Sequence, residues 1–545
     1  MRDKTASPAF RSKKKRDHLL EGGASPTFVC WATTCSHSPL FRLRWQYATA
    51  RPNCLQSPAR FDHHRLATGR IHMNRLPVLV TALLVLSSAA FFGVPESTIA
   101  NSSASAPSPS PQLPAKDKVV VYSGAAIIDG TGGPLRPDMA IVVRGERIEA
   151  IVPRAQLKVP AGAEVVDVKD QYALPGFINS HEHLAAPPDR KFAEAMMRRD
   201  LFSGVTAARC MGDDLRALAD LARASRVLEI AGPDLYYAAL FAGRDFMNDP
   251  RMIACCQGAK VGETPWIHAI DEKTDLANAV TLAKGTGAIA IKIYANLSAA
   301  LVAKIVAEAH RQGMQAWAHS MVFPATPREV IDAKPDAVSH IGYFGYQAMD
   351  KRPQKYQERE KFPIDPAPFV NGDNKIMASL FSAMKEREII LDATNYVYET
   401  IEQMRARDPQ NAPPPPFCSS KLAELLTAQA YKNGVLISAG TDSFAPWEEP
   451  YPALQGEIEI LVRKVGMTPM DAIRSATLIS AMSMGQQSEM GTLEPGKLAN
   501  IVFLSANPLQ DIGAVRQVVL TVKRGAQYPR KNYTPVTKGE VEGQF

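Results

Sequence analysis

Two histidines stand one residue apart in the stretch ALPGFINSHEHLAAPPDR, which covers residues 173–190. His181 and His183 follow a short apolar run that is typical of a buried strand. Because successive side chains of a strand alternate between its two faces, both imidazoles are expected to point the same way. Two histidines aimed at one point indicate a metal site, and such a site needs further ligands.

Two more histidines stand near the ends of predicted strands. The stretch AWAHS carries His319, and the stretch AVSHI carries His340. A single strand-end histidine is more often a hydrogen-bonded core residue than a ligand. Four of the six histidines beyond residue 72 share this position, however. Their convergence on one edge of the fold therefore favours metal ligands.

Lys292 interrupts an apolar strand in the stretch GAIAIKIYANLS. Ile289, Ile291 and Ile293 share one face of that strand, so Lys292 lies on the other face, toward the interior. A buried lysine is costly unless it is neutral or paired. A neutral amine can add carbon dioxide, and the two oxygens of the resulting carbamate can bridge two cations. A lysine that pairs with a carboxylate or reaches solvent is the alternative.

Asp442 ends the strand-like stretch VLISAGTD. An aspartate after a strand is often the N-cap of the next helix, which is the alternative interpretation. Beside several strand-end histidines, the carboxylate suits a metal ligand and a proton shuttle.

The elements that must position these residues alternate between strands and helices. Eight strands separated by helical stretches predict an α/β fold, a (β/α)8 barrel with its active site at the C-terminal ends of the strands. The strand candidates are ALPGFINSH, GVTAARC, PDLYYAA, AIAIKIYA, MQAWAHS, DAVSHIG, IILDATN and VLISAGTD.

Short strands and turn signals flank the predicted barrel on both sides. Residues 118–174 and 488–530 each read as strands joined by turns, and neither segment alone makes a good domain. We therefore expect one small β-sandwich built from both chain ends. The barrel is placed at residues 175–487, and residues 531–545 form a tail.

The N-terminal region differs in composition from the rest of the chain. Residues 1–72 contain 13 Lys and Arg against 4 Asp and Glu, a net charge of +9, so the remaining residues carry −2 of the total +7. The basic character of the chain therefore does not indicate a nucleic-acid partner. We interpret residues 1–72 as a non-native N-terminal extension.

Met73 opens a stretch with the order of a secretory signal. A basic residue, an apolar run and then small residues predict a signal peptide over residues 73–100. An uncleaved membrane anchor is the alternative. The Ser- and Pro-rich residues 101–117 are expected to form a disordered linker. The mature protein is thus expected to be exported, periplasmic or secreted, without stable membrane anchoring. The sequence does not decide whether its four cysteines form disulfides. These cysteines are Cys210, Cys255, Cys256 and Cys418.

Taken together, motifs spread over about residues 118–530 resemble the amidohydrolase superfamily. The branch is the one similar to imidazolonepropionases and to metal-dependent Xaa-Pro and Xaa-Arg dipeptidases. The matching motifs are PGFINSHEH, GVTAARCMG, AIKIY, AWAHS, AVSHIG, SAGTDS, SATLISAMSMG and GTLEPGKLANIVFLSANPLQDI.

The resemblance implies a site with two divalent cations, most suitably zinc. It implies that His181 and His183 bind the more buried cation with Asp442, and that His319 and His340 bind the second. A carbamylated Lys292 would bridge the two. Asp442 and His340 are the catalytic residues that we assign, and Asp442 passes a proton to the leaving nitrogen.

The reaction expected from this resemblance is hydrolysis of a C–N bond in an amide, cyclic amide or dipeptide. Hydrolysis of a lactone, ester or phosphotriester on the same metals is one alternative. An exported binding protein without catalysis is another. The expected partner is a small-molecule substrate, with no nucleic acid, and a homo-oligomer is left open.

The chain departs from the family pattern at several points. Cys210 follows Arg209 where the family usually has aspartate, and Ser339 replaces a glutamate before the sixth-strand histidine. Long loops are predicted over residues 240–268, 342–374 and 395–420, and such loops usually set substrate choice. Tyr294 and Arg209 are our candidates for binding a substrate carboxylate.

Overall fold

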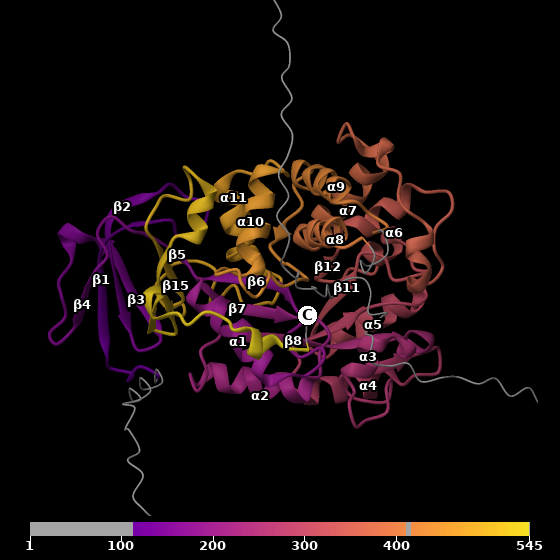
Figure 1. Ribbon diagram of the computed structural model, residues 1–545, viewed down its shortest axis with the longest axis horizontal. Coiled ribbons are helices and arrows are strands. Elements are labelled where there is room, and N and C mark those ends of the chain that lie inside the picture. Colours follow the sequence, from indigo (N-terminus) through magenta and orange to yellow (C-terminus); the bar gives the residue numbers. More distant parts are fainter. Residues whose placement is uncertain (1–112, 410–415, 544–545) are drawn as a thin grey trace, which may run out of the picture. The chain divides into compact units, whose positions relative to one another are not determined.

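The computed structural model describes residues 113–409 and 416–543 (Figure 1). Its centre is a nearly closed parallel sheet with the strand order β14-β13-β12-β11-β10-β8-β7-β6, and β9 pairs with β8 beside this path. The strands are β6 (Phe177–Glu182), β7 (Val205–Cys210), β8 (Asp234–Gly243), β9 (Ile267–Ile270), β10 (Ala290–Ile293), β11 (Gln315–His319), β12 (Ala337–Ser339), β13 (Ile390–Asp392) and β14 (Ile437–Ser438).

Backbone hydrogen bonds link the first and last strands of this sheet. The Ser180 N–H donates to the Ala439 carbonyl at 2.9 Å, and the Asp442 N–H donates to the His181 carbonyl at 3.1 Å. Strands such as β6, β7 and β10 are buried along their whole length, as expected where helices cover a parallel sheet. The predicted (β/α)8 barrel is therefore confirmed.

Helices surround the barrel strands (Figure 1). They follow the strands in alternation, and several begin with a side-chain cap; the Ser298 side chain, for example, accepts from the Leu301 N–H. The helices are α1 (Arg190–Phe202), α2 (Leu215–Arg226), α3 (Pro250–Ala254), α4 (Leu276–Gly285), α5 (Ala299–Arg311), α6 (Pro327–Asp332), α7 (Lys375–Glu386), α8 (Asn395–Arg407), α9 (Ser420–Lys432), α10 (Ala453–Arg463), α11 (Pro469–Ser475), α12 (Leu478–Met482) and α13 (Lys538–Val541).

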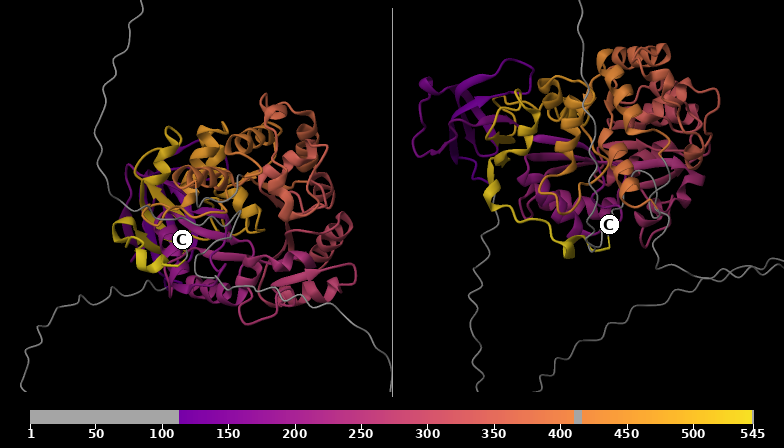
Figure 2. Two further views of the ribbon diagram at one scale, coloured as in Figure 1. Left: turned by 45° about the vertical axis from the view of Figure 1, so that its right-hand side comes forward. Right: turned by 45° about the horizontal axis from the view of Figure 1, so that its top comes forward.

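The small β domain expected from both chain ends is present as one mixed sheet. Its strands run in the order β17-β16-β15-β5-β1-β2-β3, with β4 beside β1. Figure 2 shows the yellow C-terminal strands beside the indigo N-terminal ones. The strands are β1 (Val119–Ile127), β2 (Arg136–Arg144), β3 (Arg147–Pro153), β4 (Glu164–Asp167), β5 (Tyr172–Pro175), β15 (Ile501–Leu504), β16 (Val518–Lys523) and β17 (Ala526–Pro529).

The small sheet and the barrel share a chain junction and a buried ion cluster. β5 ends at Pro175, and β6 starts two residues later at Phe177. Asp234 of β8 accepts from Arg524 Nε at 2.7 Å and lies 3.0 Å from Lys523 Nζ. All three side chains are buried. Because a buried charge is costly without a partner, this cluster ties the C-terminal strands to the barrel.

The long loops after β8 and β12 contain short helical turns. The first holds η2 (Arg244–Asn248), α3 and β9. The second holds η3 (Ile341–Ala348), η4 (Tyr356–Lys361) and η5 (Ala367–Phe369). The expectation of a loop from residue 395 onward is wrong in its first half, because residues 395–407 form α8 and bury apolar side chains such as Val397 and Ile401.

Several predictions concern residues beyond the described range. The N-terminal extension and the signal peptide lie outside the described residues, as does most of the linker. Within residues 113–409 and 416–543, no helix is long and apolar enough to cross a membrane.

Candidate metal centre

The barrel mouth brings the predicted strand-end residues together. His181 lies near the end of β6, His319 ends β11, His340 follows β12, and Asp442 follows β14. Nitrogen atoms of His181 and His340 and a carboxylate oxygen of Asp442 all lie within 4.8 Å of one another, and all three residues are buried. The ring centroids of His319 and His340 are 4.7 Å apart. The arrangement is the one expected for ligands that share a metal site.

The Asp442 carboxylate is the common neighbour of three imidazoles. Its Oδ1 lies 3.2 Å from His183 Nε2 and 3.5 Å from His181 Nε2. Its Oδ2 lies 3.7 Å from His340 Nδ1, which also contacts Thr394 Oγ1 at 3.0 Å. Burial opposes ionisation of this carboxyl, but the neighbouring histidines lower its pKa. Asp442 is therefore an anion at neutral pH.

His319 offers a direct test of whether these residues fit a metal. Its side chain is buried, yet neither ring nitrogen has a hydrogen-bond partner among the described residues. Buried polar atoms are nearly always satisfied, so an orphaned imidazole facing other ligands points to a group that the protein alone does not supply. Burial also lowers the pKa of His181, His319 and His340. Neutral imidazole is the form that binds a metal.

Lys292 faces the barrel interior, as its place in the strand predicts. Its side chain is fully buried, and Nζ donates to Ser339 Oγ at 3.1 Å. Burial lowers the pKa of Lys292 to about 7, although the negative charges of Asp392 and Asp442 oppose this shift. A large fraction of the amine is therefore neutral near pH 7, which is the form that can add carbon dioxide.

Asp392 is a site residue that the sequence analysis did not single out. It ends β13, its side chain is fully buried, and its Oδ2 lies 2.6 Å from His181 Nδ1. Burial opposes ionisation, but His181 and Arg209 lower the pKa of Asp392 to about 2. A carboxylate on the far nitrogen of a ligand histidine fixes its ring orientation. The strand-end position that marked the histidines would also have marked this residue in IILDATN.

Arg209 has a different environment from the one expected. Its side chain is fully buried and donates to Ser180 O at 2.6 Å, to Asp392 Oδ2 at 3.0 Å and to Ser483 O at 3.3 Å. The guanidinium also lies 4.7 Å from the ring centroid of Trp317. These partners lie within the protein, so the geometry favours a role in holding Asp392 over the expected contact with a substrate carboxylate.

Tyr294 lies beside the candidate metal centre, next to two loop residues, Arg251 and Tyr356. Its ring centroid is 4.0 Å from that of His319, and its hydroxyl accepts from Arg251 Nη1 at 3.1 Å. Burial raises the pKa of Tyr294 well above its usual value. Tyr356 accepts from Arg251 Nη2 at 3.4 Å. Burial opposes ionisation of Tyr356, but Arg251 and Arg359 lower its pKa.

A narrow pocket opens onto the candidate metal centre. Asp442 and His340 form part of its wall, and most of the rest is aromatic or apolar. The remaining lining residues are Tyr294, Tyr343, Tyr356, Val397, Tyr398, Ile401, Pro416 and Phe417. Such a wall suits a substrate with a large apolar group.

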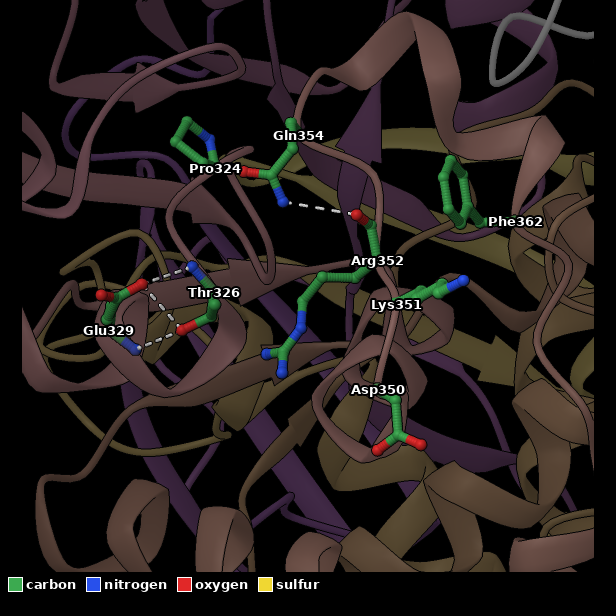
Figure 3. Close-up of a pocket in the computed structure, with 8 residues that line it drawn as sticks. All are labelled: Pro324, Thr326, Glu329, Asp350, Lys351, Arg352, Gln354 and Phe362. Atoms are coloured by element: carbon green, nitrogen blue, oxygen red, sulfur yellow. Dashed lines mark hydrogen bonds between the residues drawn. The ribbon is translucent and has the colours of Figure 1, made fainter.

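A larger depression of about 550 Å³ lies between the N-terminus of α6 and the loop that follows η3 (Figure 3). Its lining is mainly polar and charged, including Asp350, Lys351 and Arg352. Thr326 and Glu329 on its wall are engaged with each other in the capping box of α6. None of the candidate ligands lines this depression, so we place the functional site at the barrel mouth.

The fold is an eight-stranded parallel barrel, and histidines, a lysine and an aspartate gather at its strand ends. This combination defines a class of barrel proteins with a candidate metal site at the barrel mouth. The chain belongs to the amidohydrolase family, whose sequence profile matches residues 172–528. The resemblance inferred from the motifs is thereby confirmed.

Individual relatives agree with this membership. The imidazolonepropionase of Aeromonas salmonicida is 23% identical over 419 residues, which are 73% of this chain and 95% of that enzyme. The ochratoxinase of Aspergillus niger is 38% identical over 84 residues, which span only 15% of this chain and 16% of that enzyme. The crystal structure of a Xaa-Pro dipeptidase with bound methionine has a TM-score of 0.59 at 20% identity, and the match covers 76% of this chain and all of that one. This structural likeness establishes the fold.

Proposed function

We propose that the protein hydrolyses a C–N bond in an amide, cyclic amide or dipeptide with the help of two divalent cations. The observation that carries the proposal is the pair of orphaned nitrogens on buried His319, which face a cluster of further ligand-type side chains. Membership of the amidohydrolase family supports it.

We infer a division of the ligands between the two cations. His181, His183 and Asp442 would hold one, while His319 and His340 would hold the other. Lys292, as its carbamate, would bridge them. Nitrogen and oxygen donors in a hydrolase without redox chemistry suit zinc. Bound cations of this kind lower the pKa of water toward ~7 and polarise a substrate carbonyl.

The protein's own groups then hold and move the proton. The Asp442 carboxylate is ionised, so it can accept a proton from the attacking water and pass it to the leaving nitrogen. His340, whose Nδ1 lies 3.7 Å from Asp442 Oδ2, is the second residue that we place beside the reacting atoms. Asp392 and Arg209 hold His181 in position and need not contact substrate.

A substrate screen tests the proposal. Zinc-loaded protein is incubated with N-acyl amino acids, dipeptides, hydantoins and lactones, and product formation is followed by mass spectrometry. We expect turnover of at least one C–N substrate. Asp442→Asn, compared at equal zinc content, should lose ~10²-fold or more in rate. Turnover of lactones alone would support the alternative hydrolase, and turnover of nothing would support a binding protein.

We also propose that the mature protein is exported and starts after the signal peptide at residues 73–100. The proposal rests on the order of basic, apolar and small residues that begins at Met73. N-terminal sequencing of the natively expressed protein tests it, and retention of residues 1–72 would refute it.

A further inference from the structure

Arg251 connects two tyrosines of the pocket. It lies on α3, in the loop after β8, and its guanidinium donates to the hydroxyl oxygens of Tyr294 and Tyr356 at 3.1 and 3.4 Å. Asp249 fixes Arg251 through bonds to Nε and Nη2 at 2.9 and 2.8 Å. The two phenols come from different places, because Tyr294 follows β10 and Tyr356 begins η4. Arg251 thus sets the position of both hydroxyls.

This geometry determines where the hydroxyl hydrogens point. A guanidinium can only donate, so each tyrosine oxygen is the acceptor and its own hydrogen is left for another acceptor. Within the described part of the chain, neither hydroxyl donates to a protein acceptor. Both tyrosines line the pocket that contains His340 and Asp442. Two oriented O–H donors therefore remain for a ligand in this pocket.

The surroundings of Tyr356 favour a negatively charged ligand. The Arg359 guanidinium lies 3.9 Å from the ring centroid of Tyr356, and its Nη1 donates to the Tyr356 carbonyl at 3.0 Å. Together with Arg251, this places two guanidinium groups against one buried phenol. Asp249 pairs with Arg251 and Glu360 pairs with Arg359, and neither of these two carboxylates lines the pocket.

The two tyrosines stand at different distances from the metal centre. The His319 ring centroid is 4.0 Å from that of Tyr294 and 6.0 Å from that of Tyr356. If the carbonyl of a ligand lies at the metals, the group that reaches Tyr356 must therefore be further along the ligand, away from the carbonyl. Phe417, stacked on Tyr343 with centroids 4.7 Å apart, adds an aromatic wall beside that group.

We propose that Tyr356 donates its hydroxyl hydrogen to a carboxylate of the substrate, and that Arg251 is the positioning residue that holds it there. The inference rests on the proposed function and narrows its substrate class to N-acyl amino acids or dipeptides with a free carboxylate and a large apolar side chain.

Binding of a ligand that cannot be hydrolysed tests this apart from turnover. The probe is 2-benzyl-4-oxopentanoate, a carbon isostere of N-acetyl-phenylalanine, and its neutral counterpart carries a hydroxymethyl group in place of the carboxylate. Calorimetry on the zinc-loaded full chain gives the ratio of their affinities. Because a hydrogen bond to a charged group is stronger than one to a neutral group, Tyr356→Phe should lower affinity for the acid ~10-fold or more and lower that for the neutral analogue much less.

Two further variants complete the experiment. Arg251→Gln, like Tyr356→Phe, should reduce the ratio of the affinity for the acid to that for the neutral analogue. Loss of packing alone would weaken both affinities and leave this ratio unchanged. Tyr237→Phe is the matched control, because the Tyr237 hydroxyl donates to the Thr286 carbonyl away from the pocket; it should keep the parent preference. Thermal midpoints verify folding of each variant.

Three results would overturn the inference. These are equal affinity of the parent for both probes, no measurable binding of either, or an unchanged preference in Tyr356→Phe. None of them depends on the protein cleaving a C–N bond, so the inference and the proposed function can fail separately.

Discussion

Asp392 shows how much of this site depends on residues behind the proposed metal ligands. Four site side chains converge on its carboxylate: Ser180, His181, Arg209 and Ser339. The carboxylate orients the His181 ring and balances the charge of a fully buried arginine. At the level of single residues, the site therefore depends on the groups that hold the candidate ligands as well as on the ligands themselves.

Replacing this carboxylate should affect both metal binding and stability. Asp392→Asn removes the charge that faces His181, and loss of such a partner usually lowers metal affinity ~10–100-fold. It also leaves the Arg209 charge buried without a counter-ion, which costs ~3–5 kcal/mol of unfolding free energy. Zinc titration and urea unfolding measure the two effects. Asp220→Asn, at a half-exposed carboxylate on α2, is the control and should change neither. Parent-like zinc affinity in Asp392→Asn would contradict the assignment.

Lys292 gives a pH-dependent prediction for the metal-free protein. Its pKa falls from 10.5 to about 7 on folding. Between these values the unfolded chain binds a proton that the folded chain lacks, so the lysine destabilises the fold increasingly as pH falls through this window. Lys292→Met should therefore be more stable than the parent at pH 6, by a few kcal/mol as an order of magnitude. The gain should shrink toward pH 10.

Urea unfolding in chelator without bicarbonate measures this difference at several pH values. The same variant should bind less zinc when metal and bicarbonate are restored. If Lys292→Met were no more stable than the parent at pH 6, Lys292 would not be a desolvated lysine, and the route to a carbamate would lose its basis.

At the scale of elements, the ends of the barrel strands are shaped by unusual backbone. His340, Thr394 and Asp442 all have positive φ, at 71°, 54° and 48°. Non-glycine residues seldom adopt this conformation, and it concentrates at functional sites. Here it turns the chain sharply after β12, β13 and β14, so that side chains of three neighbouring strands face one point.

Gly440, between β14 and Asp442, allows the closest of these approaches. A Cβ at this position would clash with Asp392 Oδ1 and would lie 2.8 Å from both His181 Cβ and Ser180 Oγ. Gly440→Ala should therefore cost ~1–3 kcal/mol or more of unfolding free energy and displace the ligands. Thermal melting and zinc content check this.

Gly285→Ala is the matched control, because a Cβ there meets no atom within 4 Å. It should be neutral or slightly stabilising at the end of α4. A Gly440→Ala protein with parent stability and zinc content would show that the strand end is less crowded than described.

The sequence predicted the barrel strands and the positions of long loops, but not how deeply Arg209 is buried or which loop residues meet at the site. Strands that alternate with helical stretches predicted the barrel, and the alternation of side chains within one strand predicted the inward face of Lys292. It made Arg209 a candidate for binding a substrate carboxylate, but did not predict that this side chain is buried against Trp317 and Asp392. Arg251 and Tyr356 come from loops without periodicity, so only the folded chain brings them together.

In the whole molecule, the small sheet joins parts of the chain that are distant in sequence. β5 and β15 pair antiparallel, from Tyr172 against Leu504 to Pro175 against Ile501, and so bring the segments before and after the barrel into one sheet. β5 then leads directly into β6, which carries His181. The small domain thereby anchors the first ligand strand, in addition to the ion cluster around Asp234.

The proposed function requires this chain to bind two divalent cations through the strand-end residues of its barrel. Its most direct test is the zinc content of the purified protein after reconstitution with zinc and bicarbonate, measured by elemental analysis. We expect about two zinc ions per chain, as in other two-metal hydrolytic sites. A zinc content near zero would contradict the proposed two-metal site.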